Sequence, residues 1–267
     1  MSEKSAAQAT SLVKAMRVLL ALEDSPQGRG VTDIARALDL PKSAVHRVLI
    51  TFQEHGFVQQ LPQGSRYSLG PTLARLGLRA VERFTPRQVA RPYLEALAQE
   101  VRETVFLGML VQDSVLVVDK VEHGQVLRIS PALGTVLPLP QTALGKLLLA
   151  YCPAVQRDAL LHTLVETDSA LPRDNWLRAL RQELAAIAQQ GFAISLEEWT
   201  TDVCCLAAPI RQSQGQIVAA LALALPRSRM PQSPRHDPFA SHTPAAQYPT
   251  LLPALLRAAE RISAALP

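Results

Sequence analysis

The spacing of hydrophobic residues over positions 31–57 predicts two short helices joined by a tight turn. An i, i+3, i+4, i+7 spacing places one face of each helix in a core. The residues that follow it are Val31, Ile34, Ala35 and Leu38, and then Val45, Val48, Leu49 and Phe52. Because proline lacks an N–H and has a fixed φ, Pro41 suits the start of a new helix. The second helix therefore begins at Pro41 or Lys42.

The residues on either side of this helix pair complete a small domain. A preceding helix is expected over residues 12–22, with Val13, Met16, Leu19 and Leu20 turned inward. After Gly56, two short strands over 57–61 and 66–69 flank a Pro-Gln-Gly-Ser turn, which predicts a hairpin. Three helices followed by a hairpin form a winged helix-turn-helix ending near Gly70. Such a unit lays its second helix in the major groove of DNA.

The outward face of that second helix supplies candidate DNA contacts. Cationic and hydroxyl side chains near a helix N-terminus suit phosphates and base edges. With the apolar residues turned inward, the face also shows Ile50. The candidate DNA-binding residues are Lys42, Ser43, His46 and Arg47 on the helix, and Ser65 and Arg66 at the hairpin tip. The alternative is a small α+β domain whose Lys and Arg side chains are only solvated.

The rest of the chain predicts a connector and a larger domain. A helix over 71–84, opened by Pro71, is a natural connector, and a helix over 86–102 begins the larger domain. Next we expect two strands around the turn 112–114, a third strand over 125–130, and a loop up to a helix beginning near Thr142. Helices over 153–164 and 173–190 then precede a hairpin over 204–225. The chain ends with an irregular proline-rich segment over 226–253 and a helix over 253–265. This order predicts a mixed α+β domain with one antiparallel sheet.

Charge is distributed unevenly between the two predicted parts. Residues 1–85 carry eleven Lys and Arg against seven Asp and Glu, which accounts for the whole net charge of +4. Residues 86–267 carry sixteen of each. The positive excess therefore lies with the helix-turn-helix, as phosphate binding requires.

The cysteines and the chain's hydropathy exclude several classes. Cys152, Cys204 and Cys205 form no C-x-x-C pair, which indicates no disulfide framework and fits a reducing cytoplasm. No histidine lies at ordinary ligand spacing from them, so we expect no metal and no cofactor. The N-terminus lacks a signal-peptide core, and no apolar stretch is long enough to span a membrane. We expect a cytoplasmic protein with no membrane partner.

Catalytic motifs are also missing from the sequence. It contains no G-x-S-x-G, no G-x-x-x-x-G-K-[ST], and no G-x-G-x-x-G after a strand. A thiol pair of Cys205 with His123 or His162, or the carboxylates of Glu197 and Glu198, are the remaining candidates. A buried structural thiol and two carboxylates flanking a loop are the alternatives. We predict that the protein is not an enzyme.

Four motifs carry a resemblance to a known family. They are LPKSAVHRVL in the second helix, RYSLG in the wing, LPLPQTALGKLLLA at 137–150, and GFAISLEEWTTDVCCLAAPI followed by VAALALALP. Over residues 11–226 the chain resembles the IclR-type bacterial transcriptional regulators. The resemblance implies a winged helix-turn-helix domain (1–70), a linker helix (71–85) and a GAF-like domain (86–267) whose antiparallel sheet is flanked by helices. It also implies a double-stranded DNA operator, a small organic effector, and a homodimer or homotetramer.

The same resemblance implies positions for the effector. They are Ala143, Leu144, Ser195, Cys205, Ala222 and Ala224. Well-studied members have an acid at the position of Ser195 and serines at the two alanine positions. The family also usually has His-Ala where this chain has Pro140-Gln141, and Gly where it has Asp202.

Methyl groups in place of hydrogen-bonding groups predict an amphipathic effector. Its carboxylate would meet the free N–H groups at the start of the helix near Ala143, and an aromatic or other apolar body would lie over the alanines. Three alternatives stay open. Side chains could fill the pocket, Thr142 could be only a helix cap, or the large domain could only oligomerise a constitutive DNA-binding protein.

Overall fold

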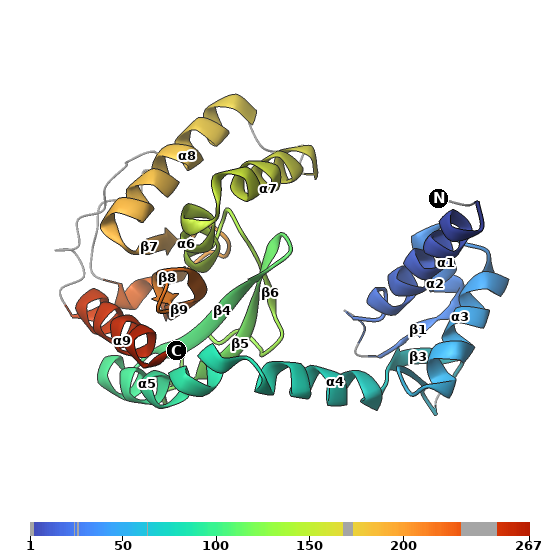
Figure 1. Cartoon of the computed structure of the whole chain (residues 1–267). Helices are drawn as coiled ribbons and strands as arrows, with labels where there is room; N and C mark the ends of the chain where they lie inside the picture. The colour runs from blue at the N-terminus through green and yellow to red at the C-terminus, as the bar shows by residue number, and fades with distance from the viewer. Residues whose placement is uncertain (1–2, 24, 26, 63, 168–172, 231–249) are drawn as a thin grey trace. The chain divides into compact units, whose positions relative to one another are not determined.

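The chain forms two separate units. A computed structural model describes residues 3–23, 25, 27–62, 64–167, 173–230 and 250–267. Contacts divide it into Met1–Arg83 and Phe84–Pro267 (Figure 1). No helix in the described part is both long enough and apolar enough to cross a membrane.

The first unit is a winged helix-turn-helix, as the sequence predicts. Its helices are α1 (Glu3–Leu20), α2 (Val31–Leu38), α3 (Lys42–Glu54) and α4 (Pro71–Glu82), and its strands β1 (Arg29–Gly30), β2 (Val58–Gln60) and β3 (Arg66–Leu69) pair in the order β1-β3-β2. The core contains Val18, Ile34, Val45, Leu49 and Tyr67. The helices α2 and α3 meet at Asp39, which adopts a left-handed conformation with φ 51°, and Pro41 then caps α3.

The inward face predicted for the first helix is wrong in part. Val13, Met16 and Leu20 are 55%, 53% and 65% exposed, whereas Val18 is fully buried. Leu19 is partly buried, as predicted. The helix packs on its neighbours through the side that carries Val18, so its second apolar stripe has no partner within the described residues of this chain. Periodicity alone did not separate the two stripes.

The second unit is one six-stranded antiparallel sheet with helices on both faces (Figure 1). The strand order is β6-β5-β4-β9-β8-β7, for β4 (Thr104–Val111), β5 (Ser114–Val121), β6 (Val136–Pro138), β7 (Ala193–Leu196), β8 (Val203–Arg211) and β9 (Ile217–Pro226). One face packs on α5 (Thr85–Val101) and α9 (Leu251–Ala265). The other face packs on α6 (Ala143–Tyr151), and α7 (Ala154–Thr167) and α8 (Arg173–Gln190) contribute side chains to the same core. The predicted antiparallel α+β class is confirmed.

The third strand is not where the sequence predicts it. Residues 125–130 form no strand, and Val126 and Leu127 are exposed. The strand β6 lies instead in the segment expected to be a loop, with Ser114 of β5 opposite Pro138. An alternating pattern defines an extended chain, but the available strand edge decides which extended segment pairs.

Two further differences concern the end of the sheet and the tail. The buried strand β7 was not predicted as a separate element, and it pairs with β8 at the sheet edge. After Pro226 the chain forms a short 3-10 helix, Arg227–Arg229, and α9 begins at Leu251. Most of the segment predicted to be irregular, residues 231–249, lies outside the described residues.

Candidate DNA-binding surface and ligand cavity

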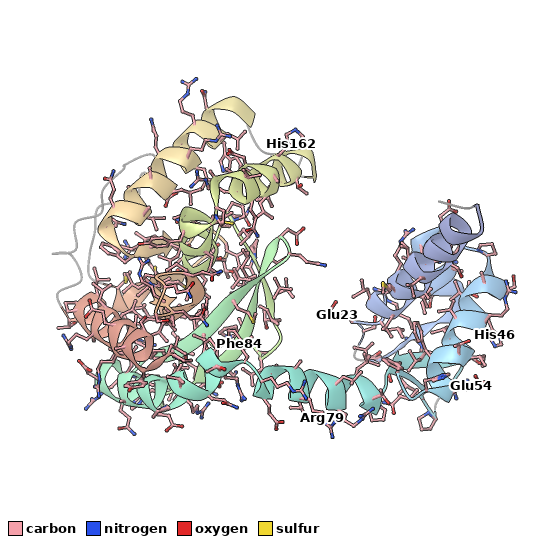
Figure 2. The ribbon with its side chains drawn as sticks, in the orientation of Figure 1. Glu23, His46, Glu54, Arg79, Phe84 and His162 are labelled. Atoms are coloured by element: carbon pink, nitrogen blue, oxygen red, sulfur yellow. The ribbon has the colours of Figure 1, made fainter. Side chains whose placement is uncertain are left out.

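The outer face of α3 displays the predicted DNA contacts. Lys42, Ser43, His46 and Arg47 are all exposed, and Figure 2 labels His46 on the outer side of the helix. Within the described residues, neither Lys42 nor Arg47 forms an ion pair. The first N–H groups of the helix have no intrahelical partner. Free cations and free N–H groups at one helix end are what a phosphate needs.

The wing places its two predicted contacts differently. Ser65 is exposed in the turn between the strands β2 and β3. Arg66 is exposed as well, but its Nη1 donates a hydrogen bond of 2.9 Å to the carbonyl of Gly28. Gly28 has φ +66°, and a Cβ there would lie 2.8 Å from the Tyr67 carbonyl oxygen. Arg66 therefore fastens the wing to the loop before β1, and its contact with DNA stays a prediction.

A cavity of about 340 Å³ lies in the second unit beside the start of α6. Its floor is the sheet, and its walls come from the helix start, β6, and the loops after β5 and β7. It is lined by Phe106, Arg128, Ile129, Ser130, Pro131, Thr135, Leu137, Thr142, Ala143, Leu144, Trp199, Thr200, Val203, Cys205 and Ala224. Most of this surface is apolar, and Arg128 is its one charged side chain among the described residues.

Four of the six predicted effector positions line this cavity. They are Ala143, Leu144, Cys205 and Ala224. Ser195 lies one strand further out, opposite Cys205, and its Oγ donates to the carbonyl of Gln141 at 3.1 Å. Ala222 is fully buried in the core between the sheet and α6. These residues share one face of the sheet, and their distance from the start of α6 decides which of them line the cavity, so sequence spacing could not resolve them.

The start of α6 is capped and still has free donors. The Oγ1 of Thr142 accepts from the N–H of Gly145 at 3.1 Å and donates to the carbonyl of Pro138 at 2.7 Å. The N–H groups of Ala143 and Leu144 precede the first intrahelical bonds, and no described residue accepts from them. Capping and anion binding are therefore compatible at this helix end.

The packing of the chain itself explains why position 145 is a glycine, which the sequence did not reveal. A Cβ at this position would lie 2.2 Å from the carbonyl oxygen of Leu139. The backbone of the chain itself approaches here, so the group that Gly145 admits is Leu139 and not a ligand.

The wall that carries Arg128 was missed because residues 125–130 were assigned to a strand. Arg128 Nε donates to Glu122 at 2.8 Å, and Lys120 Nζ donates to the same carboxylate at 2.8 Å. These bonds and one from Ser130 lower the pKa of Glu122 to about 2, with Lys120 the largest cause. The cluster holds the wall in place and leaves Arg128 facing the cavity.

The loop above the cavity is anchored by a buried lysine. Lys146 is fully buried, and its Nζ lies 2.7 and 2.8 Å from the two carboxylate oxygens of Glu198 and 2.6 Å from Glu183. Glu197 accepts from the N–H of Asp202 at 3.0 Å. The two glutamates considered as acid and base therefore tie down the loop that carries Trp199.

Cys204 is buried and Cys205 is partly buried, and the pKa of each thiol is raised. Burial, followed by the neighbouring Cys204 and Glu198, raises the pKa of Cys205 to about 12. Burial also raises the pKa of Cys204 to about 11. Both stay protonated near neutral pH, which does not suit a thiolate nucleophile. Among the described residues, no group of three or more potential ligand side chains could hold a metal ion.

Comparisons with known proteins cover both units. The family model for the bacterial transcriptional regulator IclR C-terminal region matches residues 78–263, and the IclR helix-turn-helix domain matches residues 11–62. The HTH-type transcriptional regulator XynR of Escherichia coli is 31% identical over 220 residues, which are 82% of this chain and 87% of XynR. The glycerol operon regulatory protein of Streptomyces coelicolor is 33% identical over 216 residues, covering 80% of this chain and 83% of that protein.

A solved structure extends the likeness to a ligand-bound relative. The IclR homologue from Microbacterium hydrocarbonoxydans, complexed with 4-hydroxybenzoate, has a TM-score of 0.73 and 27% identity. The match covers 96% of this chain and 98% of that one.

Proposed function

The chain belongs to the IclR family of bacterial transcriptional regulators, and from this premise we propose that a small organic carboxylate in the cavity controls its affinity for an operator. The single observation that carries the proposal is the cavity itself, which combines two free helix N–H groups with an apolar floor. We propose no catalytic step. Because the proposed target is an operator in bacterial DNA, the proposed site of action is the cytoplasm.

The DNA-binding part of the proposal rests on α3. Its exposed Lys42, Ser43, His46 and Arg47 face outward from a buried apolar side that contains Val45 and Leu49. Cations on such a face hold phosphates, and side chains near the helix N-terminus reach base edges in the major groove. Ser65 and Arg66 of the wing are proposed to contact the adjacent backbone.

We propose that a second copy of the chain covers the exposed apolar stripe of α1. Leu12, Val13, Met16 and Leu20 are each more than half exposed on one helix. A dimer also presents two recognition helices to a pseudo-palindromic operator, and pairing of dimers would give a tetramer. Light scattering should give a dimer or larger for the wild type, and Met16→Asp should shift it toward monomer. Val155→Asp, on an exposed α7 position, is the control; a wild type that stays monomeric with and without DNA would contradict the proposal.

The proposed effector is an aromatic or otherwise amphipathic carboxylate. The cavity volume lies within the ordinary range for small-ligand sites, about 300–1,000 Å³. Its carboxylate would accept from the N–H groups of Ala143 and Leu144, in a cavity that Arg128 also lines. The apolar body would lie over Phe106, Cys205 and Ala224. The relative that binds 4-hydroxybenzoate supports this class of ligand.

The alternative is constitutive DNA binding with a large domain that only oligomerises. An open cavity with unpaired donors favours ligand control, because buried polar groups are ordinarily satisfied. Side chains that filled the pocket would have left no such volume.

A thermal-shift screen of carboxylic acids tests ligand binding directly. A ligand at 100 times its Kd should stabilise the folded chain by about 2.7 kcal/mol. Aromatic carboxylates are expected to raise Tm more than glyoxylate-like acids, which lack an apolar body. If the small polar acids bind most tightly, the proposed effector class is wrong.

A further inference from the structure

The hydroxyl of Thr104 is buried without a hydrogen-bond partner. Thr104 is 1% exposed, and its Oγ1 bonds to no described residue. Only three other buried side-chain atoms in the described part share this condition, namely Ser68 Oγ, Arg87 Nε and Asp119 Oδ2. The last two lie 3.4 Å apart in an ion pair, and Ser68 belongs to the winged unit. Because buried hydroxyls are ordinarily bonded, Thr104 requires an explanation.

Strand alternation places Thr104 on the cavity side of the sheet. In β4, Val105 and Leu107 belong to the core beneath α5 and α9, whereas Phe106 belongs to the opposite core and lines the cavity. Successive side chains of a strand point to opposite faces, so Thr104 shares the face of Phe106.

The cross-strand register places Thr104 beside the cavity floor, next to two lining residues, although Thr104 itself is not among the residues that line the cavity. Thr104 pairs with Ala224 of β9, and Ala224 pairs with Cys205 of β8. Both partners line the cavity. The three residues form one row across neighbouring strands, about 10 Å long at two strand spacings. Ser195, opposite Cys205, bonds to the carbonyl of Gln141, so the start of α6 lies near the other end of the row. The row between these two ends is about as long as one aromatic ring with a polar group at each end.

The cavity wall is fastened beside this end of the row. Glu103, the residue before Thr104, forms a bidentate ion pair with Arg229. Arg229 Nη2 also donates to the carbonyl of Leu127 at 2.9 Å. The loop that carries Arg128 is thereby held next to the start of β4, beside Thr104.

We propose that Thr104 determines ligand specificity by hydrogen-bonding a polar group on the ligand end opposite its carboxylate. This inference rests on the proposed function of the cavity as an effector site. A threonine hydroxyl can donate or accept, so a ring hydroxyl or a carbonyl satisfies it equally well. The ligand class is thus a hydroxylated or otherwise polar-substituted aromatic carboxylate.

The test compares two probes and two variants. Thr104→Val keeps the side-chain shape and removes the hydroxyl, and Thr135→Val makes the same change elsewhere in the cavity lining. The probes are benzoate and 4-hydroxybenzoate, titrated calorimetrically against the full chain. The wild type and Thr135→Val should prefer 4-hydroxybenzoate by about tenfold, the ratio for one hydrogen bond. Thr104→Val should bind both probes about equally, with benzoate affinity unchanged.

The outcomes separate this inference from the proposed function. A wild type without the preference, or a Thr104→Val variant that retains it, overturns the role of Thr104. If neither probe binds the wild type at millimolar concentration, the role is also overturned, whereas another carboxylate from the screen could still support effector control. If the preference disappears as expected but neither probe changes operator affinity, the role of Thr104 stands and the control of operator affinity by these ligands fails. Thr104→Val removes an unpaired hydroxyl, so its Tm without ligand should not fall, and a large fall would point to a purely structural role.

Discussion

The two units use their basic residues in opposite ways. On α3 of the winged unit, Lys42 and Arg47 are exposed and form no ion pair within the described residues. In the sheet domain, Lys146 is fully buried between two carboxylates, and Arg229 forms a bidentate ion pair with Glu103. Two cations on α3 thus stay available for a polyanion, whereas Lys146 and Arg229 are neutralised within the sheet domain.

This difference shows that net charge alone says little about function. Residues 86–267 carry more Lys and Arg than residues 1–85, but an equal number of acids balances them. Partners and burial decide whether a cation stabilises the fold or binds a ligand. Substitutions of matched lysines and arginines should therefore separate stability from DNA affinity.

The largest expected effect is on the stability of the sheet domain. Lys146→Ala removes the cation shared by Glu183 and Glu198 and should lower the free energy of unfolding by about 3 kcal/mol, because two carboxylates lose their partner. Both carboxylates keep some exposure, which limits the loss. The control Lys42→Ala should change stability by less than about 0.5 kcal/mol, as exposed sites do. Urea denaturation of both variants measures their free energies of unfolding. Equal values would contradict the claim that the sheet domain uses its buried lysine for stability and the winged unit does not use Lys42 in this way.

The next effect is on operator affinity, in the winged unit. Arg47→Ala should weaken operator binding by about 1–3 kcal/mol if Arg47 reads a guanine edge, and should weaken all duplexes alike if it holds a phosphate. Lys42→Ala should lower the slope of log affinity against log salt by about 1. Anisotropy titrations at several salt concentrations measure both. Unchanged affinities in the two variants would remove α3 from the DNA interface.

A smaller effect is expected at the start of α6. Thr142→Ala removes the cap that accepts from Gly145 and should cost about 1 kcal/mol of stability. Because the N–H groups of Ala143 and Leu144 remain, carboxylate binding should weaken far less than it would if Thr142 held the anion itself. Thermal unfolding with and without a bound aromatic carboxylate distinguishes the two effects, and a complete loss of binding at unchanged Tm would assign the anion to Thr142.

Local chemistry explains how much of the winged unit the sequence predicts. Helix periodicity, Pro41 and the turn after Leu61 define α2, α3 and the wing almost residue by residue. The prediction for Val13 and Met16 was wrong because it needed to know which stripe of α1 finds a partner. That information is not local.

The sheet domain shows the same limit at the site. Two antiparallel hairpins follow from alternation and turns, but the strand at 125–130 was wrong because β6 took the open edge of β5. Ser195 and Ala222 lie on the cavity face of the sheet but do not line the cavity, because Ser195 lies one strand further out and Ala222 is buried in the core with α6. The contacts of Lys146 and the unpaired hydroxyl of Thr104 depend on segments distant in sequence, and no sequence motif predicts them.

The smallest expected effect is a pH dependence at the wall of the cavity. The pKa of Glu122 is lowered from its ordinary 4.5 to about 2 by Lys120, Ser130 and Arg128. A lowered folded pKa contributes stability above pH 4.5, and this contribution is lost as pH falls toward 2. Because the carboxylate is solvent-exposed, the effect is small. The Tm difference between the wild type and Glu122→Gln should be measurable at pH 7 and shrink below pH 4.5, and a difference that grows with acidity would contradict this assignment.

The most direct test of ligand-controlled DNA binding is an operator titration of Ala224→Leu. The duplex would be one selected from a random library by the full chain, and the ligand the strongest stabiliser from the carboxylate screen. Ala224 lines the cavity, so Leu should occupy part of its volume. The wild type and Ala159→Leu, an exposed α7 control, should change operator affinity on adding the ligand, and Ala224→Leu should bind the operator normally without responding. An unchanged ligand response in Ala224→Leu would contradict control through this cavity.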